Sequence, residues 1–168
     1  MNDVFVALFD HNRWANLRLI DACAGLDVDQ LGATVAGTYG SLGDTLVHLV
    51  AAEGRYVYGL GDRSGRARTM SEEMPFPGVA ALREHAAWSG DRLIDIAATV
   101  DGDPIVEDDW SGEVERLPTS LLMTQAIDHA TEHRAHIATI LTQLGIQPPE
   151  MDGWAWGFEK WIAPDGGQ

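Results

Sequence analysis

The sequence contains one cysteine, Cys23, in 168 residues, so no disulfide can form within the chain. Structural zinc sites are usually four-coordinate and rich in cysteine, and one thiol cannot build such a site. Because stable disulfides belong to oxidising compartments, a lone cysteine favours a cytoplasmic setting. We expect Cys23 itself to be a small buried hydrophobic residue within a helix.

Basic residues are also scarce: Lys and Arg total 11 against 26 Asp and Glu, which gives a net charge of −15. Nucleic acids and anionic membrane surfaces attract basic patches, so this balance argues against both as partners. No apolar run approaches the length that spans a bilayer. The first residues carry Asp3 and Asp10 and lack a basic segment, so we expect no signal peptide.

The overall composition is that of an ordinary globular domain. The chain has 168 residues, of which 45% are hydrophobic, and this predicts one domain, residues 1–168, with a sizeable core. Apolar residues recur at helical spacing in four segments. They predict long helices near residues 3–24, 42–60, 78–100 and 119–144. Four such helices with short connections predict a four-helix bundle, in which metal sites are built from side chains on facing helices.

Two shorter features complete the predicted fold. Residues 101–117 read as a turn followed by two short strands around Ser111 and Gly112. Residues 151–163 predict a short C-terminal helix. Its large aromatic residues are expected to cover the end of the bundle: Trp154, Trp156, Phe158 and Trp161. The predicted fold is therefore all-α, a four-helix bundle with a hairpin-like insertion before the last long helix and a short C-terminal helix.

The last long helix carries the strongest functional signal. We expect it to begin with Pro118 in its first turn and to stop at Gly145. His129, His133 and His136 all border its apolar side. Two histidines at i and i+4 project from one face and can converge on one ion. Core-edge histidines bonded to carbonyls are the alternative, but packing alone gives no reason to repeat the residue at this interval.

The remaining histidines are less informative. His48 lies on the second long helix beside small alanines, and its spacing does not distinguish a metal ligand from a hydrogen-bonded core histidine. We expect His11 and His85 to serve packing or capping roles.

Several motifs together resemble the DinB-like family of small four-helix-bundle metalloproteins, and the resemblance covers essentially the whole chain. They are Ser-Leu-Gly-Asp-Thr-Leu-Val-His at 41–48 with Glu53 behind it, and Asp-His-Ala-Thr-Glu-His-Arg-Ala-His at 128–136. Trp-Ala-Asn at 14–16 also looks family-like. The family's last long helix typically reads N-H-x-x-x-H-R-G-Q. The departures from that pattern in this chain are Asp128, Ala135 and His136.

The resemblance implies that His48, His129 and His133 bind a divalent metal, zinc or nickel first and iron third, with water at an open position. Characterised relatives include thiol-dependent isomerases and thiol S-transferases, in which the metal activates a low-molecular-weight thiol. The expected partner is therefore a small-molecule substrate with such a thiol. Three neutral imidazoles leave the ion its full charge, which lowers the pKa of bound water to about 7. Such a set is catalytic rather than structural.

His136 and Glu132 are the candidate catalytic residues beside these ligands. His136 could be a fourth ligand that closes the site, but at i+7 from His129 it lies roughly 10 Å along the helix, so we expect it to lie beside the site. His129 to His133 also spells HxxEH, which would make Glu132 the general base of a metal-dependent hydrolase.

A non-catalytic metal-binding dimer is the other alternative. We expect a homodimer in any case, partly from the family and partly because the apolar second helix could leave a patch to cover. A di-iron site is excluded, because no Glu is followed by His three residues later.

Overall fold

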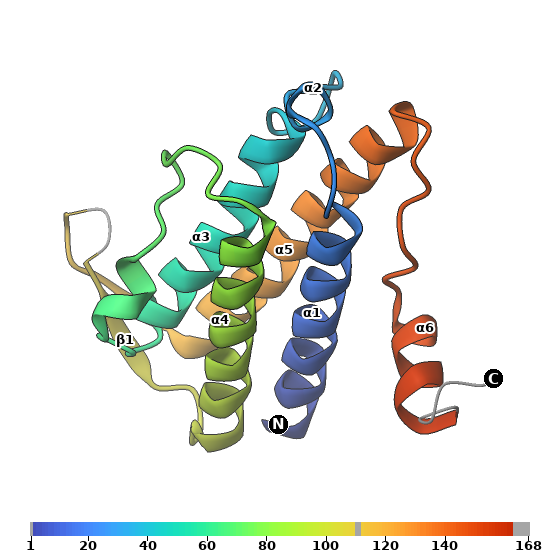
Figure 1. Ribbon diagram of the computed structural model, residues 1–168. Helices are drawn as coiled ribbons and strands as arrows, with labels where there is room; N and C mark the ends of the chain where they lie inside the picture. Colours follow the sequence, from blue (N-terminus) through green and yellow to red (C-terminus); the bar gives the residue numbers. More distant parts are fainter. Residues whose placement is uncertain (1, 110–111, 163–168) are drawn as a thin grey trace.

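The computed structural model describes residues 2–109 and 112–162, and helices dominate it (Figure 1). The four long helices are α1 (Asn2–Ala22), α3 (Leu42–Gly59), α4 (Val79–Thr99) and α5 (Thr119–Gln143). Each predicted helix is confirmed, with ends no more than two residues from those expected. No helix in the described part of the chain is both long and apolar enough to cross a membrane.

The shorter elements lie between and after these helices. They are α2 (Val28–Leu31), the 3-10 helix η1 (Gly65–Arg68), strands β1 (Ile105–Asp108) and β2 (Glu115–Pro118), α6 (Gly153–Gly157) and the π-helical η2 (Phe158–Ile162). The two strands pair antiparallel, so the predicted hairpin is confirmed. Within this hairpin, Trp110 and Ser111 lie outside the described residues, so one residue of the predicted Ser-Gly turn is not described.

Pro118 ends β2 and does not lie in the first turn of α5, which corrects our prediction for this residue. Its ψ of 141° is extended, and it pairs with Ile105 in the hairpin. The backbone N–H of Thr119 donates to Pro104 O at 3.0 Å, and Asp103 accepts from the N–H of Ser120 at 2.8 Å. The hairpin therefore satisfies the first free N–H groups of the helix that follows it.

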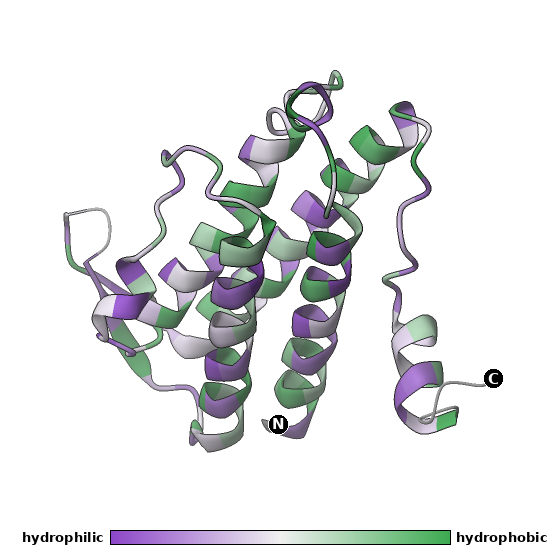
Figure 2. Ribbon diagram, in the orientation of Figure 1, coloured by the Kyte–Doolittle hydropathy of each residue, from purple (hydrophilic) through white to green (hydrophobic). Residues whose placement is uncertain are grey.

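Helix α3 is the most completely buried of the four long helices. Its N-cap is Ser41, as the sequence predicts, and the hydroxyl accepts from the N–H of Asp44 at 3.1 Å. Its apolar side chains are almost completely buried on all sides, among them Leu42, Leu46, Val47, Leu49, Val50 and Val57. By contrast, α1 and α4 alternate between hydrophobic and hydrophilic bands, as expected for outer helices (Figure 2).

A buried polar network joins the four long helices. The Glu53 carboxylate of α3 accepts from Nδ2 of Asn12 at 2.8 Å and Nδ2 of Asn16 at 3.0 Å, both on α1, and from the Ser89 hydroxyl of α4 at 2.5 Å. Arg134 of α5 donates to the side-chain oxygens of the same two asparagines at 2.5 and 2.8 Å. Burial raises the pKa of Glu53 to about 7, and it lowers that of Arg134 to about 10.

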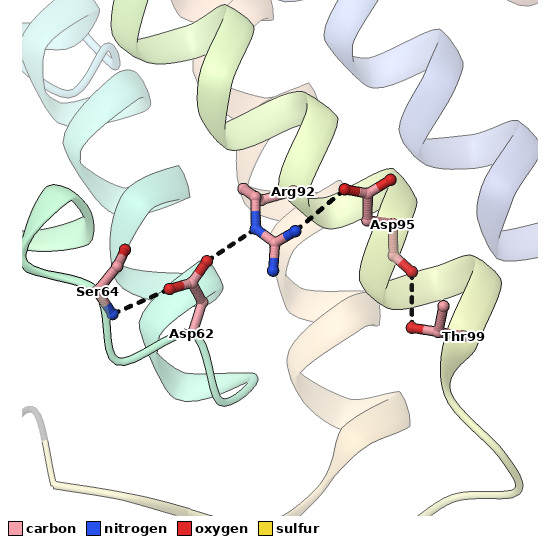
Figure 3. A network of polar contacts seen from close by, with 5 residues as sticks. All are labelled: Asp62, Ser64, Arg92, Asp95 and Thr99. Carbon is pink, nitrogen blue, oxygen red and sulfur yellow. Dashed lines mark hydrogen bonds and ion pairs between the residues drawn. The ribbon is translucent and has the colours of Figure 1, made fainter.

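A second, more exposed network ties the loop after α3 to α4 (Figure 3). Arg92 bridges Asp62 at 2.8 Å and Asp95 at 3.0 Å, and Asp62 also accepts from the N–H of Ser64. Such surface contacts contribute about 0–1 kcal/mol each, so they hold the loop locally rather than stabilise the bundle.

The expectation that four C-terminal aromatic residues cover the bundle end is wrong for three of them. Trp154, Phe158 and Trp161 are 89%, 54% and 64% exposed. The segment attaches to α1 through polar contacts, because Glu159 accepts from Nε1 of Trp14 at 2.9 Å and from Arg18 at 2.6 Å. Trp156 is the exception, since its ring meets that of His11 on α1 edge-on with centroids 5.6 Å apart, while the other three aromatic side chains face outward.

Arg134→Met should destabilise the protein by about 3 kcal/mol, because it leaves the buried Glu53 carboxylate without its cation. The measurement is the free energy of unfolding in urea. The matched control is Arg83→Met, since Arg83 is half-exposed and pairs with Asp21 at the surface. Its cost should be about 0–1 kcal/mol. Equal losses in the two variants would contradict a special role for Arg134.

Glu53→Gln should change how stability depends on pH. The folded pKa of about 7 exceeds the usual Glu value of about 4.3, so the folded state binds this proton more tightly than the unfolded state. The contribution is complete below about pH 4.3 and is lost as pH rises through about 7. Relative to the variant, the wild type should therefore lose on the order of 1–3 kcal/mol over that range. Parallel stability curves for the two proteins would contradict this prediction.

Candidate metal centre

Three imidazoles from two facing helices converge at the seam between α3 and α5. His48 comes from α3, and His129 and His133 lie one turn apart on α5. Nε2 of His48 is 2.9 Å from Nε2 of His129, and one ring nitrogen from each of the three residues lies within 4.8 Å of the others. The structure thus brings together the three residues that the sequence suggested as ligands.

The surroundings keep His129 and His133 neutral. His48 and His133 are buried and His129 is half-buried. Burial is the main cause that lowers the pKa of both His129 and His133 to about 4, and the neighbouring imidazoles add to it. Neutral imidazole is the form that binds metals, because its unprotonated nitrogen carries a free lone pair.

The donor set fits a divalent transition metal. In a tetrahedral site with metal–nitrogen distances of 2.0–2.1 Å, ligand nitrogens are roughly 3.3 Å apart, and the His48 and His129 nitrogens here are 2.9 Å apart. Nδ1 of His133 is buried and has no hydrogen-bond partner in the described part of the chain. Three ring nitrogens this close together could therefore hold one ion.

His136 and Glu132 lie next to this cluster but outside it. The His136 ring meets His133 edge-on, with centroids 5.3 Å apart, and it does not belong to the converging set. His136 therefore lies beside the cluster of three histidines. Glu132 is exposed and immediately precedes His133 on α5. A catalytic role for either residue stays a prediction.

Sequence reasoning missed two residues that contact the cluster. Glu72, in the loop before α4, places Oε2 2.8 Å from Nδ1 of His48, and this contact lowers the pKa of the Glu72 carboxyl. Tyr39, in the loop before α3, stacks on His48 with centroids 4.0 Å apart and meets His133 edge-on. Neither loop has periodicity, so no sequence signal placed these side chains near the histidines.

His11 and His85 lie away from the cluster, in the packing roles we expected. Nε2 of His11 is 2.9 Å from the carbonyl oxygen of Met151. His85 is buried against Gly54, where an added Cβ would lie only 2.8 Å from its Nε2.

Comparisons with known proteins agree with this fold. The model of the DinB family matches residues 1–162. A crystal structure of a DinB-like protein from Bacillus cereus ATCC 10987 superposes with a TM-score of 0.63 and 15% sequence identity, covering 87% of this chain and 94% of that one. At this identity the superposition shows the shared fold alone. No protein with curated annotation matches the chain.

We expect one divalent ion per chain at this cluster. His129→Ala or His133→Ala should abolish stoichiometric binding, because two remaining imidazoles hold an ion poorly. The measurement is elemental analysis of protein purified without chelator, followed by zinc titration.

Two further variants calibrate that result. His11→Ala should bind metal as the wild type does, because His11 contacts Met151 and lies away from the cluster. His136→Ala should weaken binding modestly; a loss as steep as that of His129→Ala would make His136 a fourth ligand. The site would be falsified if wild-type protein took up no zinc, nickel or iron.

Proposed function

The chain belongs to the DinB family, and from that premise we propose that it is a metal-dependent enzyme with a small thiol as co-substrate. In this proposal His48, His129 and His133 hold one divalent ion. The convergence of their ring nitrogens within 4.8 Å is the observation that carries it. Zinc and nickel suit three imidazoles, and iron is the third candidate. The reaction class is transfer or isomerisation through the thiol sulfur.

The chemistry follows from the ligand charge. A divalent ion held by three imidazoles would keep its full charge and would favour the thiolate form of a thiol bound to it. Tyr39 stacks on His48 and meets His133 edge-on, so its ring covers one side of the histidine cluster. Because Tyr39 is 51% exposed, its outer face offers a flat apolar wall to a substrate.

The co-substrate thiol comes from solution in this proposal. The chain's own thiol, Cys23, is buried, and burial raises its pKa to about 12. A protonated, enclosed thiol is inert as a nucleophile. A lone unpaired cysteine also supports placing the reaction in the cytoplasm, where thiols stay reduced.

Two alternatives use the same histidines. A hydrolase would need Glu132 as its base, yet Glu132 lies about 100° around the helix from His133 and faces solvent. A non-catalytic metal-binding dimer needs no base at all. We propose a homodimer under either reading, although α3 is buried within the chain and cannot supply the patch. The large exposed apolar side chains lie elsewhere and include Val4, Leu8, Leu121, Trp154 and Trp161.

Cobalt-substituted protein tests the thiol step directly. Adding 2-mercaptoethanol should produce a sulfur-to-cobalt charge-transfer absorption, because the thiolate takes the open position of the ion. Ethylene glycol, which lacks sulfur, should produce none, and neither should His129→Ala. A cobalt-loaded wild type that shows no thiol-dependent band would remove the thiol reaction and favour the hydrolase or the non-catalytic dimer.

A further inference from the structure

We propose that Glu72 is a positioning residue for the metal centre, which accepts a hydrogen bond from Nδ1–H of His48 so that Nε2 presents its lone pair to the ion. The inference rests on the proposed function, because it assigns a role toward the metal held by the three histidines. Neither the family match nor the sequence motifs point to Glu72.

The two ring nitrogens of His48 face different partners. Oε2 of Glu72 lies 2.8 Å from Nδ1, whereas Nε2 lies 2.9 Å from Nε2 of His129. Because the two nitrogens of an imidazole point to different sides of the ring, Glu72 cannot reach an ion held by Nε2. Glu72 therefore acts through His48 and not as a ligand of its own.

Glu72 is the acceptor available to Nδ1 of His48. That nitrogen is buried and makes no hydrogen bond of standard geometry with the described residues, so the carboxylate is close but off the N–H axis. The Glu72 side chain is 30% exposed, which leaves room for the small rotation that aligns it. Contacts at such sites often tighten when the ligand binds.

His48 needs this support more than the other two histidines do. His129 and His133 are placed together by one turn of α5, whereas His48 reaches the site from a separate helix. Tyr39 stacks on its ring with an interplanar angle of 18° and limits the ring's tilt. Stacking does not choose which nitrogen carries the proton, but a carboxylate at Nδ1 does.

The positioning role has a measurable size. A carboxylate behind a metal-binding histidine fixes its tautomer and raises its basicity, and removing it typically costs 10–100-fold in metal affinity. Glu72→Ala should therefore weaken zinc binding about 10–100-fold, measured by competition with a chromophoric chelator. Glu72→Gln should lose less affinity, because its amide oxygen still accepts a hydrogen bond from Nδ1–H but carries no charge.

The neighbouring residue supplies the control. Glu73 is exposed and carries the same charge, so Glu73→Gln removes one acidic group from the same loop without touching His48. It should bind zinc as the wild type does. If Glu73→Gln weakened binding as much as Glu72→Gln, the effect would be one of loop charge, and the inference would be overturned.

Nitrogen–proton correlation spectra of the imidazoles give a readout that does not depend on metal. In chelator-treated wild type, the His48 proton should reside on Nδ1, and in Glu72→Ala it should move wholly or partly to Nε2. A wild-type proton on Nε2, or an unchanged tautomer in Glu72→Ala, would overturn the inference. If the wild type takes up no metal, the proposed function fails, while these spectra still decide whether Glu72 sets the tautomer.

Discussion

The bundle depends on a buried carboxylate and a buried guanidinium that two amides hold together. Asn12 and Asn16 each donate to Glu53 through their nitrogen and accept from Arg134 through their oxygen. Apolar packing tolerates sliding and repacking of helices, whereas this pattern of donors and acceptors is satisfied in one register. The network therefore sets how α1, α3 and α5 face one another, and Ser89 adds α4.

That register also places the histidines. Arg134 follows His133 directly, and Glu53 lies five residues after His48, so the helices that carry the network also carry the three histidines. At 100° per residue, His48 and Glu53 point roughly 140° apart on α3. The network thus lies on the inner side of the α3–α5 seam, and the imidazoles lie toward the loops that bear Tyr39 and Glu72. A change in the phase of either helix would move both groups together.

The sequence predicted what helical periodicity and local spacing can encode. It predicted the four long helices, the hairpin, the Ser41 cap and the placement of His129 and His133 on one face of a helix. His48 came from family resemblance, because its spacing alone left it ambiguous. Periodicity could not place Glu72 or Tyr39, which lie in loops whose path depends on tertiary contacts. It also could not tell which side of the C-terminal segment packs, since Glu159 and Trp156 contact α1 whereas the other three aromatic residues are exposed.

The three histidines of the candidate site are therefore positioned by different parts of the fold. Two nitrogens are spaced by a helix whose geometry exists before any ion arrives, and the third depends on a facing helix and two loops. In small zinc domains, much of the binding free energy is consumed in folding the chain. In the proposed site, the apolar core and the buried network order α3 and α5 without an ion, so more of the free energy of metal binding would be retained as affinity. Variation among such proteins can then fall on the loops, which alter access and ligand orientation while the bundle keeps its register.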